Sequence, residues 1–86
     1  MEPELRWSGG SAVLARDVAA FAFLGRVVRT ARLSLGLTQR HLERLSGVDQ
    51  TTISRLENGK LTSLRLVRVA AIFMALSSAI RLAVSG

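Results

Sequence analysis

The stretch "LTQRHLERLSGVDQTTISRLENGK", residues 37–60, decides the fold because it holds two short helical patterns with one glycine-containing turn between them. Thr38 stands where a residue would cap the first helix, roughly residues 39–45. Leu42 and Leu45 are the expected inward residues of that helix. The stretch is therefore expected to begin with a short amphipathic helix.

A second helix is expected directly after the turn at Gly47. Asp49 can cap it, because a carboxylate accepts the free amides of the first turn and favours the positive end of the helix dipole. The helix should run to about Leu56, and Gly59 can adopt the left-handed conformation that closes a helix. So short a turn forces a steep crossing, which makes the second helix project outward.

The outward face of this second helix carries hydrogen-bonding groups. At about 100° per residue, Ile53 and Leu56 point to one side. The opposite side holds amides, hydroxyls and one guanidinium, from Gln50, Thr51, Ser54, Arg55 and Asn58. Such groups can bond to base edges in the major groove, which admits a helix. A plain solvated face is the alternative, although it would be expected to carry Glu and Lys freely.

The remaining segments are also expected to be helical, and no strand is expected. From Ser11 to Gly36, apolar residues recur at spacings of three and four, which predicts one long helix or two helices broken near Gly25. Ser63 is expected to cap a further helix, and a short final helix is expected after residues 77–78. The chain is thus predicted to be all-α, a compact bundle of about five short helices.

A chain of 86 residues suits one domain with a modest core. Residues 1–20 are predicted to form an N-terminal arm, in which Trp7 is either a docking anchor or the cover of a local apolar patch. Residues 21–76 are predicted to form the DNA-binding domain. Residues 77–86 are predicted to form an apolar C-terminal helix or tail, a potential dimer interface.

The charge balance favours a polyanionic partner. Twelve Lys and Arg face six Asp and Glu, and the excess lies after residue 23. Nucleic acid fits this balance, although a membrane surface or an acidic protein would fit it too. The absence of cysteine excludes disulfides, thiolate metal sites and cysteine nucleophiles.

The sequence argues against a membrane-spanning segment. The uncharged residues 69–80 number twelve, whereas a spanning helix needs about 20. The N-terminus opens with two acids and lacks the basic start and early apolar run of a signal peptide. A cytoplasmic, nucleoid-associated protein without a membrane partner is therefore expected.

Residues 24–76 together resemble the Cro and phage-repressor-like helix-turn-helix family, often called the XRE family. The matching residues are Arg32, Gly36-Leu37-Thr38-Gln39, Leu42, Gly47-Val48, Ile53-Ser54 and Leu56-Glu57-Asn58-Gly59. The resemblance implies a lambda-repressor-like fold that binds DNA. Three positions depart from the family pattern: Glu43 replaces the usual Ala, Ser46 replaces an apolar residue, and Ser63 replaces a Pro.

The resemblance also implies roles for single residues. The base-reading positions are Gln50, Thr51 and Arg55, with Asp49 at the start of the recognition helix. The positions matched to DNA phosphate, or expected to support such contacts, are Gln39, Ser54, Asn58, Lys60 and Arg40. Further phosphate contacts, or merely solvated cations, are Arg26, Arg29 and Arg44.

Arg32 and Glu57 are implied to be a structural ion pair, because the family pairs an Arg late in its first helix with this Glu. A buried pair of this kind is strongly destabilised when one partner is lost. The alternative is an exposed pair of little energetic weight.

No catalytic constellation is found in the sequence. It lacks a phosphate-binding Gly-Lys-Ser loop, cysteine, tyrosine and a second histidine, and its acids are scattered. A metal role for His41 is not expected. The chain is therefore predicted not to be an enzyme, and to use no cofactor, metal or small-molecule substrate.

The last third is apolar nearly all round, which implies burial on more than one face. Leu64, Val67, Ala71 and Met74 are expected to complete the core. The dimer interface is then expected to use Ile72, Phe73, Leu76, Ile80 and Leu82, unless the N-terminal extension covers them.

The predicted function is a sequence-specific DNA-binding transcription regulator, acting as a repressor on a palindromic operator as a homodimer. Three alternatives stay open. One is the DNA-binding antitoxin of a toxin-antitoxin pair, in which a toxin holds the apolar tail or the Trp7 arm. The others are a helix-turn-helix used only for protein interaction and a basic tail that lies on a membrane surface.

Overall fold

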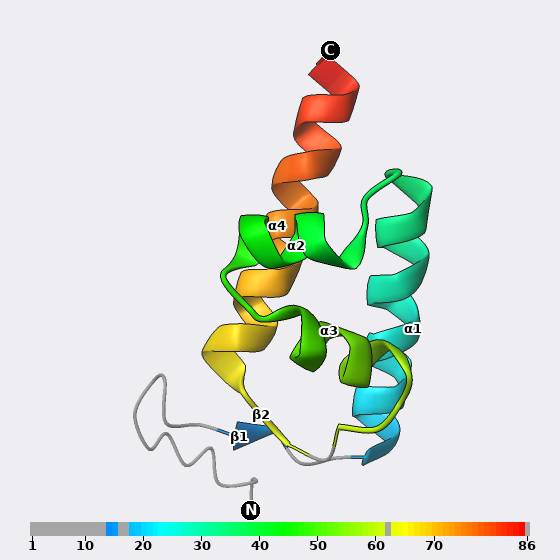
Figure 1. Ribbon diagram of the computed structural model, residues 1–86, viewed down its shortest axis with the longest axis vertical. Helices are drawn as coiled ribbons and strands as arrows, with labels where there is room; N and C mark the ends of the chain where they lie inside the picture. The colour runs from blue at the N-terminus through cyan, green and yellow to red at the C-terminus, as the bar shows by residue number, and fades with distance from the viewer. Residues whose placement is uncertain (1–13, 16–17, 62, 86) are drawn as a thin grey trace, which may run out of the picture.

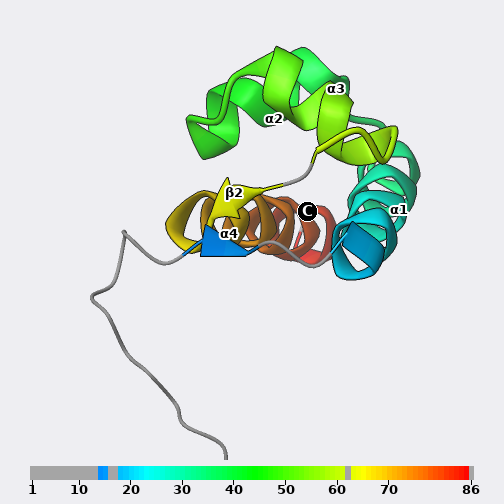
Figure 2. The ribbon, with the colours of Figure 1, turned by 90° about the horizontal axis from the view of Figure 1, so that it is seen from below.

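Four helices and one very short sheet form the part of the chain that the computed structural model describes, residues 14–15, 18–61 and 63–85. In chain order the elements are β1 (Leu14–Ala15), α1 (Val18–Ser34), α2 (Gln39–Ser46), α3 (Gln50–Glu57), β2 (Leu64–Arg65) and α4 (Leu66–Ser85). α2 and α3 lie together on one side of α1 and α4 (Figures 1 and 2). The all-α prediction is confirmed.

The expectation of no strand is wrong at one place. β1 pairs antiparallel with β2, with Leu14 opposite Arg65 and Ala15 opposite Leu64. A two-residue pairing shows no alternation in the sequence, because alternation needs at least four residues to be recognised. The pairing holds residues 14–15 in an extended conformation, and α1 begins after them, at Val18. The helix was expected to begin directly after Ser11, a residue that lies outside the described part of the chain.

α1 runs as one helix through Gly25, which settles the choice that periodicity left open. Gly25 is buried, and the backbone of α3 crosses it closely. A Cβ atom at this position would collide with the carbonyl oxygen of Leu56. The glycine therefore permits the close approach of α1 and α3, which outweighs the modest cost of a helix-interior glycine.

The predicted caps of α2 and α3 are confirmed. The hydroxyl Oγ1 of Thr38 accepts the amide of His41 at 3.0 Å, and His41 Nδ1 accepts the amide of Thr38 at 3.2 Å, which completes a capping box. Oδ2 of Asp49 accepts the amide of Thr52 at 3.0 Å. Between the helices, Gly47 adopts the left-handed conformation at φ +77°. Local sequence chemistry thus sets where both helices begin and where the turn lies.

The core contains residues from every helix. Its fully buried side chains are Phe21, Val28, Leu42, Ile53, Leu56 and Ile72. Leu42 was expected there, but the expectation for Leu45 is wrong, because that side chain is 54% exposed. Leu45 lies in the last turn of α2, at the edge of the core, where it lines an open hollow together with residues of α4 and so stays partly in contact with solvent.

α4 differs from the prediction in both its start and its length. Residues 64–65 belong to β2, so the helix begins at Leu66 and not directly after Ser63. It then continues unbroken for 20 residues, so the expected short fifth helix is its second half. Ser77 and Ser78 do not interrupt it, because serine lowers helix propensity only slightly and keeps its backbone amide.

The two faces of α4 are assigned differently from the expectation. Val67 and Met74, expected in the core, are exposed, at 51% and 69%. Ile72 and Leu76, expected at an interface with a second chain, are buried in the core of this one. Periodicity could not separate these faces, because apolar residues occupy nearly the whole circumference of the helix.

By length and composition alone, α4 could also cross a membrane. The sequence argument against a membrane span used the length of the uncharged stretch between Arg68 and Arg81. The helix is longer than this stretch, because it includes both arginines and continues beyond them. The first half of α4, however, supplies Val69, Ile72 and Ala75 to the core. A core helix passes the same test, so the finding is weak evidence for a membrane.

Replacing Gly25 by Ala should destabilise the protein by about 1 to 3 kcal/mol, because the added methyl group forces α1 away from α3. The free energy of unfolding, measured by urea titration, checks this. Ser34→Ala, at an exposed position of the same helix, is the matched control and should be neutral or slightly stabilising. An equally stable Gly25→Ala protein would contradict the close approach.

Candidate nucleic-acid interface

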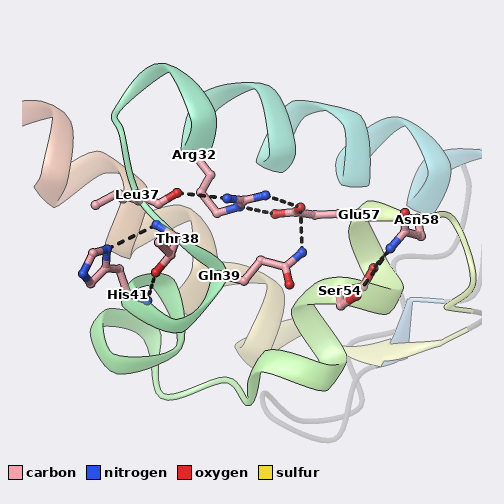
Figure 3. A network of polar contacts seen from close by, with 8 residues as sticks. All are labelled: Arg32, Leu37, Thr38, Gln39, His41, Ser54, Glu57 and Asn58. Atoms are coloured by element: carbon pink, nitrogen blue, oxygen red, sulfur yellow. Dashed lines mark hydrogen bonds and ion pairs between the residues drawn. The ribbon is translucent and has the colours of Figure 1, made fainter.

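Arg32 of α1 and Glu57 at the end of α3 form a buried, bidentate ion pair (Figure 3). Arg32 donates from Nε to Oε2 and from Nη2 to Oε1 of Glu57, both at 2.8 Å. Its Nη1 donates to the carbonyl oxygen of Leu37 at 2.9 Å. Each residue is only 7% exposed. The guanidinium thus joins α1, α3 and the segment that leads into α2.

Both groups of the pair stay charged. Burial by itself raises the pKa of Glu57, but hydrogen bonds from Arg32 and Gln39, together with the charges of Arg32 and Arg29, hold it below its ordinary value. The pKa of Arg32 is raised, chiefly by its hydrogen bond to Glu57 and despite the opposing effect of burial. The carboxylate is therefore compensated within the protein and does not present a negative charge to a polyanion.

Gln39, the first residue of α2, is held by the same carboxylate. Its Nε2 donates to Oε1 of Glu57 at 3.1 Å. A side-chain amide nitrogen carries two hydrogens, so one donor and the carbonyl oxygen are left for other partners. The start of α2 is thereby oriented relative to the end of α3.

The outward side of α3 carries most of the residues that the sequence assigned to base contacts. Thr51 and Arg55 are exposed, and Gln50 is half-buried. On the other side of the helix, Ile53, Leu56 and Glu57 are buried. α3 therefore stands in the domain with its hydrogen-bonding face directed to solvent and its apolar face in the core.

Asp49 is occupied as a cap. Besides the amide of Thr52, it accepts the hydroxyl of Thr52 at Oδ1, at 2.8 Å, and Arg68 of α4 lies 3.6 Å from Oδ1. The pKa of Asp49 is lowered, first by the hydroxyl of Thr52 and then by its amide. Both oxygens hold the first turn of α3, and a base-reading role for Asp49 stays a prediction.

The turn after α3 uses most of its hydrogen-bond donors internally. The side-chain nitrogen of Asn58 donates to the carbonyl oxygen of Ser54 at 2.8 Å and lies 3.4 Å from its hydroxyl. The backbone amides of Asn58, Gly59 and Lys60 all donate to carbonyl oxygens of α3. Exposed cations nearby include the side chain of Lys60 here and that of Arg40 on α2. Contacts of these residues with phosphate stay predictions.

Two features of the site were missed in the sequence. His41 is a partner in the capping box of α2, and the spacing of Thr38 and His41, which matches that motif with His in place of Glu, could have indicated it. The second feature is Arg68 of α4, which lies beside Asp49, the residue that caps α3. No local pattern could show this contact, because the two residues are distant in the sequence.

The residues assigned to a dimer interface lie in two different environments. Ile72 and Leu76 are core residues, and Phe73 is half-buried against the core. Ile80 and Leu82 are exposed, on the part of α4 that continues beyond the other helices (Figure 1). Of the five positions, only Ile80 and Leu82, in the second half of α4, are exposed and so free to contact a second chain.

Comparison with known proteins identifies a family. A family model described as Helix-turn-helix matches residues 28–78, more than half of the chain. No curated protein and no solved structure matches the chain. Among the described residues, no group of three or more His, Cys, Asp or Glu is placed to hold a metal ion.

Replacing Arg32 by Ala should lower the free energy of unfolding by about 3 to 5 kcal/mol, because it leaves the carboxylate of Glu57 buried with Gln39 alone. Urea titration measures the loss, and Arg44→Ala, at an exposed position of α2, is the control. Leucine at both positions 32 and 57 should recover much of the stability. A loss below about 1 kcal/mol for Arg32→Ala would place the pair with ordinary exposed pairs.

Proposed function

This chain belongs to the Cro/C1-type helix-turn-helix family and is a DNA-binding regulator, and from this we propose that it is a repressor that binds a palindromic operator as a homodimer. The observation that carries the proposal is the outward face of α3. This face combines amide, hydroxyl and guanidinium groups on a helix whose opposite side is fixed in the core. A regulator of this kind acts in the cytoplasm, on the nucleoid.

In the proposed complex, α3 lies in the major groove. Arg55 is suited to a bidentate contact with guanine, Gln50 to one with adenine, and Thr51 to either base or to a thymine methyl group. Each good bidentate contact would contribute about 1 to 3 kcal/mol of discrimination between bases. Asp49 would act mainly by holding the first turn of α3 in place.

Phosphate contacts would set the register of the protein on the duplex. The remaining amide hydrogen of Gln39 supports a contact at the start of α2. The exposed cations Arg40 and Lys60 support contacts on either side of α3. Ser54 and Asn58, which bond to each other, would mainly shape the turn, and a contact by Asn58 would require its amide group to reorient.

The second half of α4 supports the proposal of a homodimer. Ile80 is 47% exposed and Leu82 is 72% exposed, and Val84 beyond them is exposed as well. Apolar side chains gathered on a projecting helix favour association with a second apolar surface. Two copies related by a two-fold axis would place two recognition helices about 34 to 36 Å apart, one turn of DNA.

Selection from a randomised duplex pool should enrich a two-fold symmetric site. The Arg55→Ala protein should bind this site about 10- to 100-fold more weakly and lose preference at one base pair in each half-site, because one bidentate contact of about 1 to 3 kcal/mol is removed. Sequencing of the selected pools and titration of the wild-type site measure both effects.

Arg44→Ala, on the exposed surface of α2, is the matched control and should keep the full sequence preference. Binding without any enriched motif, abolished by a modest rise in salt, would contradict a sequence-specific regulator. It would leave only the electrostatic, sequence-independent attraction of a basic protein.

Leu82→Glu should convert the homodimer into a monomer, because it places a charge on the apolar surface that the two copies share. Sedimentation or light scattering measures the mass of each protein. Val18→Glu, an exposed position at the other end of the molecule, is the control and should leave the dimer intact. A wild-type chain that is monomeric at all concentrations, or a dimeric Leu82→Glu protein, would contradict this interface.

A further inference from the structure

A hollow of about 580 Å³ lies between α1 and the end of α3. α1 contributes Ala22, Arg26 and Arg29 to its lining, and the end of α3 contributes residues 57–59. Arg26 and Arg29 are exposed and three residues apart, so they lie one above the other on the same side of α1. The hollow therefore has two cations on one wall.

The charge of this hollow is positive. Among the described residues that line it, Glu57 is the one acid, and its carboxylate is already bonded to Arg32 and Gln39. The side chain of Glu57 has no exposed area. Arg26 and Arg29 therefore determine the charge that an approaching molecule meets.

The opposite wall has few donors to offer. The amides of Asn58, Gly59 and Lys60 and the side-chain nitrogen of Asn58 all bond to groups of α3. A turn at this place could by itself have held an anion through its backbone. With these groups occupied, an anion in the hollow must be held by the two guanidinium groups, whose planar forks match the geometry of phosphate oxygens.

We propose that Arg26 and Arg29 bind the DNA backbone, so that the phosphate contacts extend from the turn after α3 onto α1. This inference rests on the proposed function, because it takes the duplex to lie along the outward face of α3. Lys60, exposed directly after the turn, continues the basic surface from α3 to the hollow. The two arginines contact phosphates next to those near the end of α3 and contribute to affinity but not to base preference.

The salt dependence of binding tests the inference. The probe is the duplex site that the wild-type chain selects from a randomised pool, and the variant is Arg26→Gln with Arg29→Gln. Each lost phosphate contact reduces the slope of log K against log salt concentration by about 0.9. A double variant that loses both contacts should show a slope smaller by about 1.8 in each bound chain, with an unchanged selected motif.

Arg81→Gln is the matched control, because Arg81 is exposed on α4 and does not line the hollow. Its slope should equal that of the wild-type protein. Urea titration of all three proteins shows that each is folded, and light scattering shows that each has the same mass in solution. A double variant that is folded and keeps the wild-type slope would overturn the inference.

Neutral methylphosphonate groups, introduced at one backbone position at a time, locate the contacts. At the positions bound by Arg26 and Arg29, the substitution should weaken the wild-type protein several-fold and leave the double variant unaffected. Equal weakening of both proteins at every position would overturn the inference even if the slopes differ. A wild-type chain that selects no motif would instead contradict the proposed function, and the inference with it.

Discussion

The arrangement of the helices depends on the buried ion pair between Arg32 and Glu57. The guanidinium contacts the end of α3 and the carbonyl oxygen of Leu37, and the carboxylate in turn holds Gln39. Three segments that are distant in the sequence are thus fixed around one pair of charges. A buried charge without its partner costs several kcal/mol, so alternative packings of α3 that break the pair are strongly disfavoured.

The same pair also has an electrostatic consequence. The end of α3 carries a carboxylate, which would repel a polyanion if it faced solvent. Burial raises the pKa of this carboxyl group, but the hydrogen bonds and the charge of Arg32 hold it low, so the group stays charged while it is removed from the surface. Arg26 and Arg29, which line the same hollow, are exposed cations, as is Lys60 directly after the turn. One interaction thus supports the packing of α3 and the positive surface on which the proposed contacts depend.

The two halves of the continuous helix α4 have different structural roles. Its first half fills the core with Val69, Ile72 and Ala75. Its second half continues past the other helices and leaves apolar side chains uncovered. The apolar area that the second half leaves in water is unfavourable for an isolated chain. This half is therefore the part of the described structure that most needs a second surface to complete it.

The sequence by itself determined the local features. Thr38, Asp49 and Gly47 mark the helix ends and the turn, because caps and left-handed glycines act within a few residues of the backbone they satisfy. The all-α class and the helix-turn-helix were predictable for the same reason. The family pattern also indicated the pairing of Arg32 with Glu57 and favoured a buried pair, although it did not indicate the bond of Arg32 to Leu37.

Only the tertiary structure decided the features that depend on contacts between distant segments. From the sequence, Gly25 is a residue of low helix propensity inside a helix. The structure shows that the backbone of α3 passes so close to it that no side chain fits there. The two faces of α4 could not be told apart, because an apolar circumference has no period that separates core from surface. The hollow beside Arg26 and Arg29 likewise exists only where α1 meets the end of α3. Each of these features depends on the distance between two elements. Periodicity and capping residues describe single elements and give no information on that distance.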